Sequence, residues 1–272
     1  MTVRPLLWRA TVAVIIALIV LPLYWAAVSS LTPDQRLFAA PSLIPRDLTL
    51  AHYRALFDER DFWRPLRNSL IVAAATTALS VTLGAACAYA LARLRFRGRG
   101  ATLAAVLAVS MFPQISIVSP LYMLLRALHL LNTFPGLVLP YLTFAMPLTI
   151  WLLVGFFRQL PAGLEEAASL DGASRLRTLW EIVLPISAPG LATTAILTFL
   201  YSWNEFLFAL SFTLGPERYT VPVAIALFRG QYQVPWGEIL AAAIVATIPV
   251  ALLVLVAQRR IVAGLTSGAV KG

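Results

Sequence analysis

The sequence EAASLDGASRLRTLWEIVLP, residues 166–185, is a polar, helix-forming segment between two long apolar segments. The other long segments of the chain are apolar enough for lipid, whereas this one has the composition of a surface that meets a soluble partner. Acidic residues stand at its start, where the positive end of a helix dipole favours them. Asp171-Gly172 is a turn signal. We therefore expect two short helices outside the membrane, 165–170 and 173–183, joined by a turn.

The composition of the whole chain is that of an integral membrane protein. Of its 272 residues, 60% are hydrophobic and 12% are charged, whereas soluble domains carry about 25% charged residues. A soluble core cannot bury such an excess of apolar side chains. The net charge of +9 is therefore attributed to arginines that mark one side of a bilayer, and not to a nucleic-acid-binding surface. Cys87 is the only cysteine, so no intrachain disulfide can form.

Six segments are long and apolar enough to cross a bilayer, since a spanning helix needs about 20 mostly apolar residues. They are residues 7–29, 68–91, 101–125, 137–157, 190–210 and 239–257. Prolines interrupt the third, fourth and sixth of these spans, and each removes a backbone hydrogen bond that lipid cannot replace. The sequence thus predicts an all-α membrane protein with six transmembrane helices in a single domain, residues 1–272.

The distribution of arginines predicts which side of the membrane each loop faces. If the N-terminus is inside, the inside segments hold 12 basic residues and four acids, and the outside segments hold nine basic residues and seven acids. Short cytoplasmic loops are enriched in Lys and Arg. Both termini and the 158–189 loop are therefore expected in the cytoplasm. The same side receives the loop between the second and third spans, which carries Arg93, Arg95, Arg97 and Arg99.

The 166–185 segment resembles the signature loop of the membrane subunits of bacterial ABC importers. In that family the pattern is E-A-A, three residues, G, nine residues and I-x-L-P. The positions that match are Glu166, Ala167, Ala168, Gly172, Ile182, Leu184 and Pro185. The resemblance implies a type I importer permease whose cytoplasmic coupling helix inserts into a cleft of a separate ATP-hydrolysing subunit.

The same resemblance implies roles for single residues of the loop. Glu166 would be the polar anchor to the ATPase, and Ala167 and Ala168 would form the contact surface. The elbow at Asp171 and Gly172 would complete the ATPase-coupling site. The chain contains no G-x-x-x-x-G-K-[ST] motif, so it cannot be the ATPase itself, and a partner must bind the ATP.

Two further segments resemble the carbohydrate permeases of this family, those of the maltose G-subunit type. Trp203-Asn204-Glu205-Phe206 in the fifth span is similar to their W-N-E-F segment. The tail at 258–272, QRRIVAGLTSGAVKG, looks like that of trehalose/maltose-type permeases. The resemblance implies that this tail lies against the ATPase pair, through Leu265, Thr266, Gly268 and Lys271.

The fifth span and its neighbours supply the candidates for a substrate pathway: Asn204, Glu205, Trp203, Tyr201 and Tyr141. A charged side chain in lipid costs about 2.5–3.5 kcal/mol, so Glu205 is expected to face the bundle interior or the wet end of its span. It either helps to line the pathway or the partner interface, or it is a packed acid near the external boundary. The aromatic rings can stack on sugars, but Trp and Tyr also populate membrane-interface belts.

The function implied is that of half a translocation pore for a neutral oligosaccharide, a disaccharide such as trehalose or maltose. The implied partners are a second permease subunit, a dimeric cytoplasmic ABC ATPase, an extracytoplasmic sugar-binding protein and membrane lipid. The expected location is the bacterial cytoplasmic membrane. We expect no catalytic site, cofactor, metal or nucleic acid on this chain; neither histidine has a second ligand at metal spacing.

Three other functions remain as alternatives. An importer permease for a glycerol phosphate would be expected to carry intramembrane arginines, of which the spans hold essentially none. A stand-alone secondary transporter would need paired intramembrane acids, and Glu205 stands nearly alone. An enzyme acting on lipid-linked sugars would need clustered acids, and the closest trio is Asp58, Glu59 and Asp61. Those acids alternate with arginines, which favours a solvated ion-pair face.

Overall fold

The computed structural model describes residues 3–38, 47–161, 163–228 and 234–269, with side chains described from residue 8 to residue 256 within those ranges. All regular secondary structure in these ranges is helical, which confirms the predicted all-α class. The chain forms two compact units. Unit 1 comprises Met1–Trp63 and Ala224–Pro249, and unit 2 comprises Arg64–Val223 and Val250–Gly272.

Four long helices have the length and hydropathy of membrane spans. They are α1 (Val3–Ser30), α4 (Trp63–Arg93), α7 (Phe134–Arg158) and α14 (Trp236–Ala269). Two further spans are bent pairs, which raise the number of spans to six if each pair counts as one. The first pair is α5 (Arg99–Ser110) with α6 (Gln114–Ala127), bent by 89°, and the second joins Arg175–Ile186 to α11 (Ala188–Trp203), bent by 84°.

Two of the predicted spans do not form single helices. The 101–125 span breaks between Ser110 and Gln114, where Pro113 cannot donate a backbone hydrogen bond and disfavours a helical residue before it. The 190–210 span breaks after Trp203, and a separate helix, α12 (Leu207–Phe212), begins four residues later. Pro113, one of the prolines noted in the sequence, marks the first break. Hydropathy passes over the second, because Asn204 and Glu205 are two polar residues within an apolar stretch.

Unit 1 joins the end of α1 to three short elements and the start of α14. The short elements are α2 (Asp34–Leu37), α3 (Ala51–Arg54) and the π-helical turn η1 (Ala55–Glu59). His52 is buried, and its Nε2 lies 3.0 Å from the carbonyl oxygen of Thr32. Arg60 donates to Glu238 at 2.8 Å and lies over the ring of Phe228. Arg60, one of the arginines that alternate with Asp58, Glu59 and Asp61, therefore has Glu238 of α14 as an ion-pair partner.

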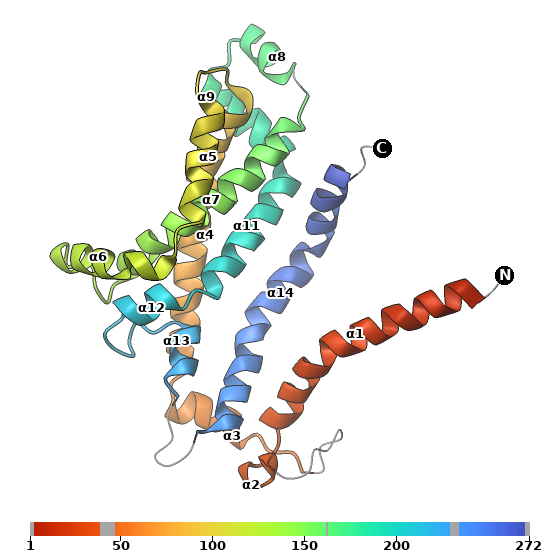
Figure 1. Ribbon diagram of the computed structural model, residues 1–272, viewed down its shortest axis with the longest axis vertical. Helices are drawn as coiled ribbons and strands as arrows, with labels where there is room; N and C mark the ends of the chain where they lie inside the picture. Colours follow the sequence, from red (N-terminus) through yellow and green to blue (C-terminus); the bar gives the residue numbers. More distant parts are fainter. Residues whose placement is uncertain (1–2, 39–46, 162, 229–233, 270–272) are drawn as a thin grey trace. The chain divides into compact units, whose positions relative to one another are not determined.

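Unit 2 is organised around α7, which packs against α5 and α11, while α12 packs against α6 and α7. Small residues allow close helix approach: a Cβ on Gly190 would lie 2.5 Å from the ring of Phe156, and a Cβ on Gly84 would lie 2.9 Å from Thr149. The loop elements α8 (Leu164–Leu170) and α9 (Arg175–Thr178) lie at one end of this unit (Figure 1).

Candidate coupling site and pathway

The 158–189 loop folds into four short helical elements: α8, α9, η2 (Leu179–Val183) and α10 (Leu184–Ile186). The first expected helix, 165–170, is confirmed, and the second begins two residues late, at Arg175. Ser174 starts it because its side chain accepts a hydrogen bond from the backbone N–H of Arg177, as an N-cap does. Gly172 has φ +77°. This left-handed conformation, which only glycine adopts without cost, makes the elbow between α8 and α9.

The two faces of α8 differ in exposure. Glu166 and Ala167 are exposed, and Leu170 at the end of the helix is 90% exposed. Ala168, which the resemblance places in the contact surface with Ala167, is buried, with 2% of its surface exposed. The burial of Ala168 follows from its position on the helix, because residues three apart share a helix face. Ala168 shares a face with Glu165, which points toward the bundle.

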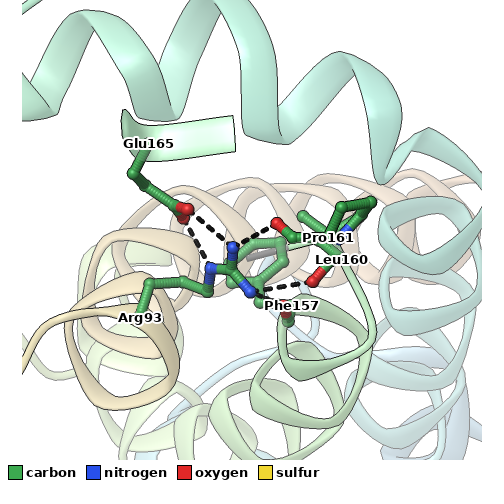
Figure 2. A network of polar contacts seen from close by, with 5 residues as sticks. All are labelled: Arg93, Phe157, Leu160, Pro161 and Glu165. Atoms are coloured by element: carbon green, nitrogen blue, oxygen red, sulfur yellow. Dashed lines mark hydrogen bonds and ion pairs between the residues drawn. The ribbon is translucent and has the colours of Figure 1, made fainter. Parts of the chain in front are cut away.

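Glu165 is held by Arg93, the last residue of α4 (Figure 2). The guanidinium donates from Nε to Oε1 of Glu165 at 2.5 Å and from Nη2 to Oε2 at 2.6 Å. The same group donates to three backbone carbonyls at the end of α7 and just beyond it. Their residues and distances are Pro161 at 2.7 Å, Leu160 at 2.9 Å and Phe157 at 3.4 Å. One side chain thus joins α4, α7 and α8.

The Arg93 side chain is 9% exposed and the Glu165 side chain is 24% exposed. Hydrogen bonding from Arg93 is the main cause that lowers the pKa of the Glu165 carboxyl below 4.5, its ordinary value. A lowered folded-state pKa means that the pair contributes stability above the ordinary value and loses it as the pH falls through the lowered value. The pair is therefore intact at neutral pH.

The second half of the loop is attached by apolar packing. Leu179 and Val183 are buried in a cluster that includes Tyr89 of α4 and Leu153 and Phe157 of α7. The loop is therefore fixed to both transmembrane helices at two places, a polar one at α8 and an apolar one at η2. Nothing in the local sequence pattern indicated the polar attachment.

In the fifth span, Asn204 and Glu205 lie in the break between α11 and α12. Asn204 is exposed, whereas Glu205 is 7% exposed. The carboxylate of Glu205 accepts the backbone N–H of Phe208 at 2.8 Å and that of Ala209 at 3.1 Å. These are unpaired donors of the first turn of α12, so Glu205 caps that helix. Of the two interpretations left open by the sequence, this geometry favours the packed acid.

The three aromatic candidates lie in different surroundings. Tyr141 and Trp203 are interior residues, 1% and 5% exposed, and so do not face an open pathway in this conformation. Tyr201 is half-buried, and its hydroxyl accepts a 2.6 Å hydrogen bond from the amide of Gln114. Gln114 was not predicted as a candidate; the available signal was a polar residue directly after the proline that breaks its span.

Tyr201 and Gln114 line a pocket of about 350 Å³ in unit 2. The other lining residues come from α5, α7 and the break before α6: Leu107, Ser110, Phe112, Phe144, Leu148 and Trp151. The lining is mostly apolar and aromatic, with one amide–hydroxyl pair, a composition that suits an uncharged ligand. The predicted tail contacts at Leu265, Thr266, Gly268 and Lys271 lie outside the residues whose side chains the structure describes.

Residues 66–267 match the family described as binding-protein-dependent transport system inner membrane component. The chain belongs to this family. It is therefore a permease subunit of an ABC importer. The exposed α8 and its Gly172 elbow are formed by the segment that resembles the signature loop of such subunits. Membership of this family also means that the chain is a membrane component of a transport system that depends on a binding protein.

Curated relatives of this permease cover nearly its whole length. It is 46% identical to the trehalose transport system permease protein SugB of Mycobacterium tuberculosis, over 99% of this chain and 98% of that protein. It is 42% identical to the trehalose/maltose transport system permease protein MalG of Thermococcus litoralis, over 96% and 95%. A chain from the crystal structure of a bacterial ABC transporter involved in alginate import has the same fold, with a TM-score of 0.79, 22% identity and coverage of 94% and 96%.

Proposed function

We propose that this permease forms half of the translocation pore for a neutral disaccharide of the trehalose or maltose kind. The observation that carries the proposal is the α8 element: Glu166 and Ala167 are exposed on a short helix that Arg93 ties to the transmembrane helices. A surface of this kind suits docking to a soluble partner. Near-full-length identity of 42–46% to trehalose and trehalose/maltose permeases supports the substrate class.

The proposed complex has four further chains: a second permease, two copies of a cytoplasmic ATPase and an extracytoplasmic sugar-binding protein. ATP binds to the ATPase pair, and this chain contributes no catalytic residue or cofactor. The pull of the closing ATPase pair on α8 tilts the attached helices and switches the pore between its inward-open and outward-open states. The substrate enters from the binding protein when the pore opens outward.

Both termini of the chain are proposed to lie in the cytoplasm, on the side of α8. The Arg93–Glu165 pair supports this orientation, because it ties the arginine-rich turn between α4 and α5 to the loop that carries α8. Basic residues in short loops mark the cytoplasmic side. Labelling of single cysteines from either side of the membrane tests the orientation: a cysteine at Arg95 should react only from the cytoplasmic side.

Two features favour a neutral sugar over a glycerol phosphate. The pocket beside Tyr201 has no charged residue among its described lining residues, whereas recognition of a phosphate would require arginine or lysine. Its amide–hydroxyl pair and aromatic rings suit sugar hydroxyls and sugar-ring faces. The direct test is uptake by the complete complex in proteoliposomes, with labelled trehalose, maltose and glycerol 3-phosphate. Uptake of glycerol 3-phosphate alone would contradict the proposal.

Tyr201→Phe and Gln114→Ala should raise the KM for sugar uptake about tenfold with little change in assembly. Each removes one partner of a half-buried hydrogen bond, and with it one of the polar groups of the pocket that can hold a sugar hydroxyl, a loss of about 1–2 kcal/mol. Initial uptake rates against sugar concentration check this. Tyr122→Phe, a half-buried tyrosine of α6 outside the pocket lining, is the matched control. A KM equal to that of the control would remove Tyr201 from the pathway.

A further inference from the structure

Three elements of unit 2 converge on the Arg93 guanidinium. Its three nitrogens donate to both carboxylate oxygens of Glu165 and to three backbone carbonyls, one in the last turn of α7 and two just beyond it. A planar guanidinium presents its donors in a fixed fork, so these bonds set direction as well as distance. The first turn of α8 therefore cannot turn or slide relative to α4 and α7 unless these hydrogen bonds break.

The apolar attachment at η2 lies on the other side of the elbow from this contact. Leu179 and Val183 come after Gly172, so their packing fixes the second half of the loop and does not hold the first turn of α8. Apolar packing is also non-directional. On α8 itself, the residues that face outward are exposed, and Glu165 is the residue whose charged group is bonded to a transmembrane helix.

We propose that Arg93 and Glu165 are positioning residues that transmit the movement of α8 to α4 and α7. This inference rests on the proposed function, in which a partner ATPase moves α8. Glu166 meets the ATPase on the outer face of the helix, and Glu165, one residue earlier, holds the inner face to the pore helices. The two neighbouring acids thus have opposite tasks, one at the partner and one within the chain.

A double-mutant cycle in the complete complex tests the transmission. The variants are Arg93→Ala, Glu165→Ala and the double variant, with Arg95→Ala as control, an exposed arginine two residues from Arg93. Each complex is purified and reconstituted. Three quantities are measured: recovery of all subunits, basal ATP hydrolysis, and sugar molecules transported per ATP hydrolysed. The sugar transported per ATP hydrolysed is the decisive quantity, because a mere loss of folded protein would not change it.

Both single variants should lower the sugar transported per ATP about tenfold while subunit recovery and basal hydrolysis stay near wild type. The double variant should be no worse than the poorer single variant, because the two side chains act as one unit. Arg95→Ala should match wild type. The inference would be overturned if the losses of the two single variants multiplied in the double variant. It would also be overturned if Glu165→Ala transported as much sugar per ATP as wild type.

Two conservative variants keep the test decisive if Arg93→Ala fails to assemble. Arg93→Lys keeps the charge but cannot bridge the carboxylate and three carbonyls together, and Glu165→Gln keeps the shape without the charge. Both should assemble and show an intermediate ratio; a wild-type ratio in both would overturn the inference. The proposed function is judged separately, because its failure would appear as absent uptake in the wild-type complex.

Discussion

Glu166→Ala should reduce ATP-driven uptake by about 30-fold or more while membrane insertion stays intact. Glu166 is exposed on the outer face of α8, and its loss removes a charged anchor without disturbing the interior of this chain. Truncating one partner of a buried, hydrogen-bonded charge pair at an interface costs about 2–5 kcal/mol, and about 1.4 kcal/mol is a tenfold change. Uptake into proteoliposomes is the measurement, together with recovery of the ATPase during purification.

Gly172→Leu should have a similar effect through the backbone. At φ +77° a residue with a Cβ is strained by about 1–2 kcal/mol, so the elbow would open and α8 would turn away from its docking direction. Gly163→Ala is the matched control, because this glycine at the other end of α8 has φ −79° and open space around its Cβ position. Wild-type uptake in both Glu166→Ala and Gly172→Leu would remove α8 as the coupling element.

Glu205→Ala should destabilise the permease and lower the yield of assembled complex, with a fall in Tm of about 5 °C. The reason is the loss of the cap on α12, about 1–2 kcal/mol, at about 2–4 °C per kcal/mol for a chain near this size. Glu205→Gln keeps one acceptor and should lie between Glu205→Ala and wild type. Thermal unfolding in detergent and size-exclusion recovery of the complex are the measurements.

Asn204→Ala is the natural comparison for Glu205, since it is the neighbouring residue in the same break but is exposed. It should assemble normally, so that any change appears in the uptake rate. If Glu205→Ala keeps the wild-type Tm and loses only uptake, the carboxylate belongs to the pathway and the capping interpretation fails.

The fold class and the coupling loop could be predicted from sequence because both depend on local patterns. Apolar runs of about 20 residues identify spans without any long-range information. The 164–170 helix and the Gly172 turn follow from the acids, the small residues and the glycine. The proline at 113 marked the break in the third span, but the chain break before Leu207 was missed, because hydropathy does not register where a side chain caps a helix.

The contacts that attach and line the site could not be predicted. Arg93 and Glu165 are 72 residues apart, and Gln114 and Tyr201 are 87 apart. Neither pair leaves a periodic signal, since the partner of a polar residue depends on how the helices pack. The burial of Ala168 follows from the same contact, because Glu165 turns that face of α8 inward.

The central claim is that α8 docks this permease onto a separate ATPase. The most direct measurement places a photo-crosslinking amino acid at Ala167 and irradiates native membranes, with the same amino acid at Leu48, exposed in the predicted external loop, as control. The account predicts an adduct with a Walker-motif ATPase at 167 and none at 48. Absence of that adduct at 167, with the chain purifying alone and homogeneous, would contradict it.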